Sequence, residues 1–429
     1  MANGKIRLKN AIAIGIGGMV GGGIFAVLGL AVSLAKGGTP VAFLLAGIIA
    51  LFTAYSYSKL SLVYPDRGGT VRFVNEGFGK GIFSGGINNV LWISYIIMLS
   101  LYASAFGSYA PNLISLTGTK TIDVHIFISA VILLATMINY YSLKVVGNIE
   151  SLAVFIKLFI LLAFVGLGIY GLLGNPNISQ LDPANWESPI NLLAGGMVIF
   201  VAYEGFELIA NAVSDMVNPK SNVPKAYFIS VGFVVFLYIT IALITVGSLN
   251  FDVIAKAKDY VLAEAAKPLI GQIGFVIMTV AALISTFSAI NATVYGGSRV
   301  SYELAEDDEL PHEFTFQLWN KPIGLLITVI LTLLTANFLN LESISTSGSS
   351  GFLLIFSIVN YVAYRKAEKV NANKYIALVG AILCFTAFVV LIIQQYASNR
   401  KGVLNSLGII VTCFLMEWIY KKTEKKKDQ

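Results

Sequence analysis

The chain has 429 residues, of which 56% are hydrophobic and only 12% are charged, and its mean hydropathy is +0.78. Water-soluble domains carry roughly 25% charged residues, so this composition excludes an ordinary soluble enzyme or binding domain. The formal net charge is +6, and there are 2 Cys and 2 His residues without metal-ligand spacing, so we expect neither a disulfide framework nor a metal site.

Uncharged apolar windows recur along the chain, most of them long enough for a membrane-spanning helix of about 20 residues. We therefore expect an all-α integral membrane protein with about twelve spans, folded as a single transmembrane domain over residues 1–429. No loop then has room for a soluble catalytic domain, so we expect no enzyme. In chain order the windows are Asn10–Ala35, Gly37–Ser58, Gly81–Thr119, Ile126–Leu143, Leu158–Leu181, Ser188–Tyr203, Ala226–Phe251, Pro268–Ser298, Pro322–Leu341, Ser343–Tyr364, Tyr375–Asn399 and Gly402–Met416.

The basic residues are distributed unevenly between alternate loops. With the N-terminus in the cytoplasm, the inside loops hold 21 Lys and Arg and the outside loops 7, and Lys157 lies within a span, which completes the 29. This is the positive-inside pattern, so we expect both termini in the cytoplasm and the protein in the cell membrane. The basic tail Lys421–Lys427 is interpreted as a topology and anionic-lipid signal, not as a nucleic-acid arm. The first window is too long for a signal peptide, so we expect it to be retained.

Spans one and six differ from ordinary helices in their glycine content. Span one carries six glycines between Gly15 and Gly23, and each weakens a helix by about 1 kcal/mol relative to Ala. Span six carries Gly195, Gly196 and Gly205 close to two glutamates. Close helix packing is the alternative explanation of the glycines in span one. Two interrupted helices at corresponding positions of two halves point to a transporter binding site, so we expect both spans to be broken.

Four short motifs carry a family resemblance, and they follow one another over about 290 residues. They are Gly21-Gly22-Gly23-Ile24-Phe25, Pro65-Asp66-Arg67-Gly68-Gly69, Gly205-Phe206-Glu207 through Asn218–Pro224, and Tyr295–Val300 through Glu309-Leu310-Pro311. Together they resemble the amino acid–polyamine–organocation (APC) superfamily of permeases. The resemblance implies the leucine-transporter-like fold, with inverted five-helix repeats at about Asn10–Gly174 and Ile190–Tyr364 and two further helices at about 373–420. It also implies amino acids, polyamines or related amines as substrates.

An amino-acid zwitterion needs hydrogen-bond donors for its carboxylate and acceptors for its ammonium group. The half-helix that starts near Gly23 would direct its amides and its positive dipole end at the carboxylate. By resemblance, the amides of Gly21, Gly22 and Gly23 hold the carboxylate, and the carbonyls of Met19, Val201 and Glu204 hold the ammonium group. Tyr102 in span three and Tyr203 in span six are further candidates for the substrate site.

Lys157 is the candidate for coupling transport to protons. It lies about eight residues into span five, roughly 12 Å deep, where a lysine is expensive and is a functional candidate by default. Related sodium-coupled transporters place an ion at the junction of spans one, five and eight, and certain proton-coupled members place a lysine amine there. The resemblance then gives Lys157 the Gly17 and Val20 carbonyls and the hydroxyls of Ser288 and Ser285 as partners. The alternative is a structural lysine that never changes its protonation state. No cofactor is expected, because the proton is the coupling ion.

Two glutamates in span six leave the substrate class open. Glu207 matches a family position that serves in gating or proton handling, whereas Glu204 departs from the usual apolar residue. Glu204 could select cationic substrates, act as a second proton site, or be a neutral hydrogen-bonded core carboxyl. The leading interpretation is proton symport of amino acids. Amine or amino-acid exchange is the rival within transport, and a non-transporting membrane sensor is the rival from another class. The sequence does not fix the oligomeric state.

Overall fold

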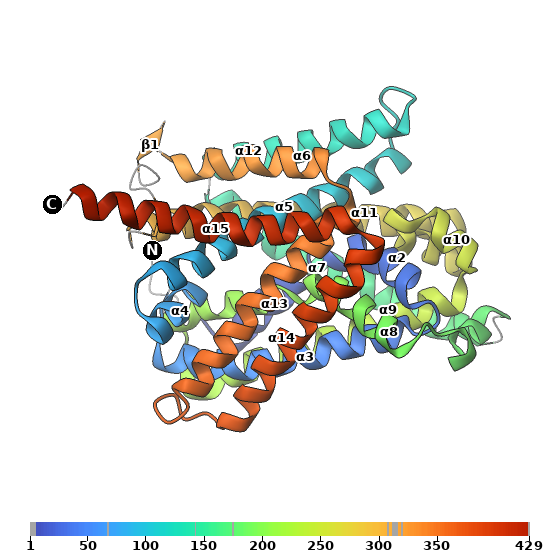
Figure 1. The fold of residues 1–429 in the computed structure, drawn as a ribbon. Coiled ribbons are helices and arrows are strands. Elements are labelled where there is room, and N and C mark those ends of the chain that lie inside the picture. Colours follow the sequence, from blue (N-terminus) through green and yellow to red (C-terminus); the bar gives the residue numbers. More distant parts are fainter. Residues whose placement is uncertain are drawn as a thin grey trace.

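The computed structural model describes residues 6–66, 68–141, 143–173, 176–306, 309–310, 316–318 and 321–427. Within these ranges the chain forms a bundle of long helices, with one short antiparallel pair of strands, β1 (Gln317–Leu318) and β2 (Lys321–Pro322) (Figure 1). The predicted all-α class is therefore confirmed. Arg67 and Pro311 of the family motifs, and the predicted repeat boundary at Gly174, lie outside the described residues.

The helices follow one another with short connections. Their bounds are α1 (Leu8–Met19), α2 (Gly23–Ala35), α3 (Thr39–Val63), α4 (Thr70–Phe78), α5 (Ile82–Tyr109), α6 (Lys120–Tyr141), α7 (Leu143–Leu172), α8 (Pro189–Val198), α9 (Pro219–Ser248), α10 (Phe251–Lys256), α11 (Val261–Glu306), α12 (Ile323–Phe338), α13 (Leu341–Arg365), α14 (Lys374–Ser398) and α15 (Arg400–Lys427). Short 3₁₀ helices continue span six as η4 (Phe200–Tyr203) and η5 (Phe206–Asp215). Others fill the loops as η1 (Ala110–Asn112), η2 (Pro176–Leu181), η3 (Pro183–Asn185) and η6 (Lys258–Tyr260). α11 is kinked at Gly271, where φ is +66°.

Nine helices in the described part of the chain are long and apolar enough to cross a membrane. Two bent pairs of shorter helices, α1 with α2 and α8 with η4 and η5, raise the number to eleven. α12 is apolar but has only 16 residues, so the predicted count of twelve stays a prediction. The two bent pairs are spans one and six, and the predicted interruption of both is confirmed.

The bundle has a buried centre and an apolar outer surface. The apolar window of α5 is 89% buried, whereas those of α6, α7 and α15 are 28% buried. Apolar surface on this scale would be unstable in water, and it suits the lipid around a membrane protein. Both broken spans lie inside, where α1 packs on α9 and η5, and α8 packs on α3 and α14. The two ends of the described chain lie at the same end of the bundle (Figure 1).

The bounds of span five differ from the prediction. The sequence window began at Leu158 and ended at Leu181, but α7 runs from Leu143 to Leu172. A hydropathy window stops at charges, whereas a helix passes through them because its backbone hydrogen bonds are internal. Lys157 therefore lies at the middle of α7, with about ten residues of helix or more on either side.

Candidate substrate and coupling site

Span one is broken at three consecutive glycines. α1 ends at Met19, α2 begins at Gly23, and the two helices bend by 46°. Within the described residues, no protein group accepts a hydrogen bond from the amides of Gly21, Gly22 or Gly23, although all three glycines are buried. Buried amides without a partner are rare and unfavourable. The start of α2 is therefore a candidate anion site, as the sequence predicts.

The backbones of the two broken spans touch at a pair of glycines. A Cβ added to Gly18 would lie 2.8 Å from the carbonyl oxygen of Gly205, and one added to Gly205 would lie 2.6 Å from the amide nitrogen of Met19. Gly205 also has a φ of +120°, which L residues with a side chain rarely adopt. Any side chain here would push the two spans apart, so these glycines set the distance across the site.

Serines of α13 form hydrogen bonds at the break in span six. α8 ends at Val198, and the chain then bends by 50° into η4 and η5. Ser345 and Ser349 each donate a hydrogen bond of 2.8 Å to the carbonyl of Val198. The Val201 amide donates to the Ser349 hydroxyl at 3.0 Å, so Ser349 bridges the two sides of the break. Sequence reasoning missed these serines, although the dense run of small and hydroxyl residues from 343 to 351 is a usable signal.

Lys157 lies at the point where α7 meets the end of α1. Its side chain is fully buried, and Nζ donates to the carbonyl oxygen of Gly17 at 3.0 Å. Phe155 and Phe159 of the same helix are exposed, so α7 presents aromatic rings outward and the lysine inward. The arrangement brings the lysine to one predicted partner, and the coupling role stays a prediction.

The predicted serines of α11 lie on the other side of the same break. Ser285 donates to the carbonyls of Val20 and Gly21 at 3.1 and 2.6 Å. Ser288, about one turn further along α11, lines the cavity beside Gly17. The end of α1 is thus held by a hydroxyl from α11 and an amine from α7, and the Val20 carbonyl that was expected to accept from Lys157 accepts from Ser285.

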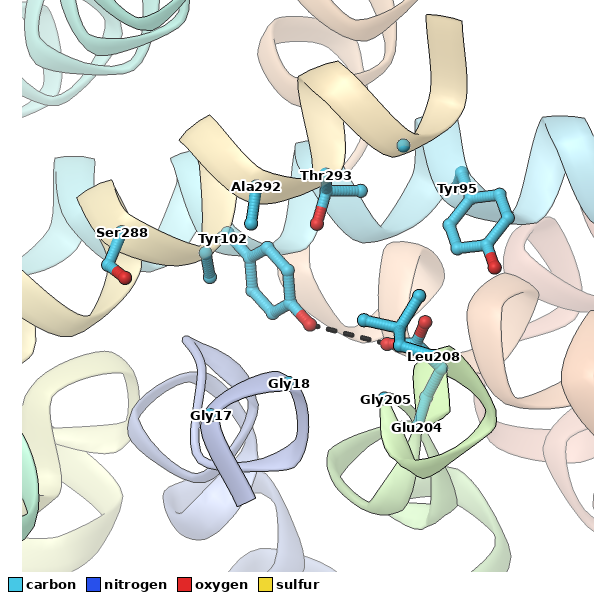
Figure 2. A pocket seen from close by; sticks show the side chains of 12 residues that line it. Gly17, Gly18, Tyr95, Tyr102, Glu204, Gly205, Leu208, Ser288, Ala292 and Thr293 are labelled. Atoms are coloured by element: carbon cyan, nitrogen blue, oxygen red, sulfur yellow. Dashed lines mark hydrogen bonds between the residues drawn. The ribbon is translucent and has the colours of Figure 1, made fainter. Parts of the chain in front are cut away.

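A cavity of about 40 Å³ lies against the two breaks (Figure 2). One water needs roughly 10–15 Å³ by this measure, so the cavity has room for about three waters and not for an amino acid. The conformation is therefore contracted around the site. Its lining residues come from α1, α5, span six and α11, and they are Gly17, Gly18, Tyr95, Tyr102, Glu204, Gly205, Leu208, Ser288, Ala289, Ala292, Thr293 and Gly296.

Glu204 and Tyr102 meet in the lining of this cavity. The Tyr102 hydroxyl donates to Oε2 of Glu204 at 3.3 Å, and both side chains are buried (Figure 2). Oε2 of Glu207 instead accepts from the Gly205 amide at 2.7 Å, and within the described residues its Oε1 has no hydrogen-bond partner. Glu207 does not line the cavity, but its carboxyl group interacts electrostatically with that of Glu204. Of the two glutamates, Glu204 is the one that can contact a ligand.

Three other predicted residues are engaged elsewhere. The Met19 carbonyl accepts from the Tyr238 hydroxyl at 2.7 Å. The Val201 carbonyl accepts from the amide of Glu204 at 3.3 Å. The Tyr203 hydroxyl donates to a backbone carbonyl of α3 at 2.9 Å, which turns its ring away from the cavity. The predicted substrate site is therefore only partly assembled around the cavity in this conformation.

Metal ligands do not gather within the described ranges, where no group of three or more His, Cys, Asp or Glu side chains could hold an ion. Cys384 and Cys413 are buried and form no disulfide. The site is thus made of backbone amides, hydroxyls, carboxyl groups and one amine. Such groups can bind and release a small polar ligand and can exchange protons.

Two broken membrane-length helices beside a small cavity that contains a few polar groups define the class of secondary transporters built on discontinuous helices. The profile of the family described as "Amino acid permease" matches residues 6–417 of the chain. The chain belongs to this family, and with it to the APC superfamily of permeases. It is therefore a multi-pass membrane transporter and not an enzyme.

Relatives match over almost the whole length of the chain. An uncharacterized protein of Methanocaldococcus jannaschii is 34% identical over 99% of this chain and 97% of its own. The inner membrane transport protein YbaT of Escherichia coli is 30% identical over 98% and 97%. The gamma-aminobutyric acid permease of Bacillus subtilis is 23% identical over 99% and 95%. The similarity thus covers both broken spans and the segment with Lys157.

Proposed function

We propose that this chain imports amino acids by proton symport with alternating access, and that it lies in the cell membrane with both termini in the cytoplasm. Relatives named as permeases for gamma-aminobutyric acid and for branched-chain amino acids support the substrate class. The free amides of Gly21, Gly22 and Gly23 support it as well, because they suit a carboxylate. The proton is the coupling ion, and no cofactor takes part.

The hydrogen bond from Lys157 to Gly17 carries the proposal. A protonated amine donates a strong, charge-assisted hydrogen bond, and a neutral amine donates a weaker one. Gly17 is adjacent to Gly18, which touches span six and lines the cavity. Loss of the proton from Lys157 would therefore loosen the end of α1 against α7, next to the substrate. Proton release and movement of α1 would be one event, which is what symport requires.

The position of the cavity fits release to the cytoplasm. In the proposed topology α1 runs outward and span six runs inward, so Gly17 before the first break and Leu208 after the second share the cytoplasmic side. Both line the cavity, as does Gly296 further along α11. The cavity thus leads from the breaks toward the cytoplasm. The cavity is too small for an amino acid, so we expect α1 to move before substrate leaves.

The test is uptake into proteoliposomes of labelled L-amino acids and putrescine, with and without an inward proton gradient and with and without sodium. Wild type should concentrate at least one amino acid only when the proton gradient is imposed. Lys157→Ala should bind that amino acid but fail to concentrate it. The control is Lys267→Ala, which removes a half-exposed lysine paired with Glu264 at 2.8 Å in the first turns of α11, and it should couple normally.

Three results would contradict the proposal. Uptake by wild type that ignores the proton gradient but requires substrate inside the vesicles would establish exchange. Normal coupling by Lys157→Ala would make the lysine structural. A chain that binds an amino acid and never moves it under any gradient would instead be a sensor.

A further inference from the structure

Two of the three backbone carbonyls expected to bind the substrate ammonium group are already in use. Met19 accepts a hydrogen bond from Tyr238 at 2.7 Å, and Val201 accepts one from the amide at position 204. Neither residue lines the cavity. Of the three residues expected to bind the ammonium group, only Glu204 lines the cavity, so its acceptor atoms are the ones that a ligand could reach.

The carboxyl group of Glu204 is an acceptor that lines the cavity. It is 4% exposed, accepts a hydrogen bond from Tyr102 at 3.3 Å, and interacts with the neighbouring carboxyl group of Glu207. A carboxylate offers about four acceptor positions, so part of its capacity is unused. Burial makes an unpaired carboxylate unfavourable, so the site gains most from a cation with several donors. A primary ammonium group has three donors and fits this description.

Tyr102 stands between this carboxyl group and the free glycine amides. A Cβ added to Gly22 would lie 2.5 Å from Cδ1 of the ring, and one added to Gly21 would lie 3.5 Å from Cζ. The ring therefore runs along the glycines, and its hydroxyl ends at Glu204 (Figure 2). The amides themselves do not line the cavity. A substrate carboxylate can reach them only after the ring has moved.

We infer that Glu204 binds the ammonium group of the substrate and that this binding displaces the side chain of Tyr102. We call this side chain a latch, because it covers the glycine amides until its hydroxyl leaves Glu204. The ammonium group takes the place of the Tyr102 hydroxyl at Glu204, and the ring then swings off Gly21 and Gly22. The uncovered amides then donate hydrogen bonds to the carboxylate of the same molecule. The substrate class is a zwitterion with one ammonium and one carboxylate group, not a diamine, because the amides have no role for a second cation. This inference rests on the proposed function, since it assigns groups within the same site.

The test is equilibrium binding to purified protein in detergent by isothermal titration calorimetry, without any gradient. The ligands are L-alanine and L-leucine, each with its analogue lacking the amine (propionate, 4-methylpentanoate) and its analogue lacking the carboxylate (ethylamine, isoamylamine), together with gamma-aminobutyrate and putrescine. Wild type should bind at least one amino acid more tightly than all the analogues and putrescine. In Glu204→Gln the affinity for that amino acid should fall by roughly 10- to 100-fold. The remaining affinity should be close to that for the analogue lacking the amine.

Two further variants separate the roles. Glu207→Gln changes the neighbouring carboxyl group of span six, which does not line the cavity but interacts with Glu204, so the preference for the amino acid over its amine-free analogue should fall less than in Glu204→Gln. Tyr102→Phe keeps the ring and removes the hydroxyl that competes for Glu204, so binding should be equal or tighter by a few fold. A merely structural tyrosine would give weaker binding.

Four results would overturn the inference. Unchanged affinity in Glu204→Gln would refute the ammonium site while leaving the proposed transport intact. Tighter binding of putrescine than of every amino acid would refute the assignment of a zwitterion as the substrate class. Weaker binding by Tyr102→Phe, in protein that elutes as a single folded species on size exclusion, would refute the latch. If wild type bound no amino acid at all, the substrate class in the proposed function would fail together with this inference.

Discussion

The contact between the two broken spans gives a sharp prediction for Gly205→Ala. The new Cβ would meet the backbone of Gly18 and Met19, at 2.6 Å from the Met19 amide nitrogen, and neither backbone can turn aside as a flexible side chain could. Overpacking of this kind costs roughly 1–3 kcal/mol. The φ of +120° adds about 1–3 kcal/mol for a residue with a side chain. We therefore expect the free energy of unfolding to fall by roughly 2–6 kcal/mol. A fall at the lower end of this range already reduces the ratio of folded to unfolded protein by a factor of about 30.

The assay for Gly205→Ala is thermal unfolding in detergent, followed by substrate binding and uptake on the protein that remains folded. Gly232→Ala is the matched control, because Gly232 lies within α9 and an added Cβ would meet nothing within 4 Å. The control should unfold at the same temperature or higher, since Ala favours a helix by up to about 1 kcal/mol. Wild-type stability and transport in Gly205→Ala would refute the steric reasoning.

Three more substitutions test the supports around the breaks. Ser349→Ala removes one of the two hydroxyl donors to Val198 and leaves the buried Val201 amide unpaired, so we expect about 1–3 kcal/mol of lost stability by chemical denaturation and weaker substrate binding. Tyr238→Phe removes the hydroxyl that donates to the carbonyls of Met19 and Ala202, and we expect the free energy of unfolding to fall by about 1 kcal/mol. Unfolding identical to that of the wild type would contradict this. Lys258→Met breaks a partly exposed ion pair of 3.4 Å with α13, so the change in unfolding should be under about 1 kcal/mol and should disappear at high salt.

The broken spans could be predicted because their signal is local. A dense run of glycines cannot be stable as a continuous helix, and Gly21, Gly22 and Gly23 lie at the observed break. The location of Lys157 against Gly17 was accessible too, but only through the family resemblance. The uncharged window by itself began after Lys157, because charges end an apolar window and do not end a helix, whereas the expected span already included the lysine.

The hydrogen bonds that hold the two breaks in place could not be predicted, because they join segments that are far apart in the sequence. Ser349 meets Val198 from 151 residues away, and Tyr238 meets Met19 from 219 residues away. Both pairs depend on how whole helices pack, which no local pattern encodes. Tyr203 shows the converse, since its place in span six suggested the substrate site while packing against α3 turned its hydroxyl elsewhere. An aromatic content of 12% makes such assignments ambiguous from sequence alone.

Proton movement driven by substrate is the most direct test of coupling through Lys157. Proteoliposomes would hold a trapped pH indicator, start with equal pH on both sides, and receive the transported amino acid outside. The account predicts that the lumen acidifies as labelled substrate accumulates, and that Lys157→Ala abolishes the acidification while Lys267→Ala preserves it. Substrate influx with no change in internal pH, or equal acidification by Lys157→Ala, would contradict it.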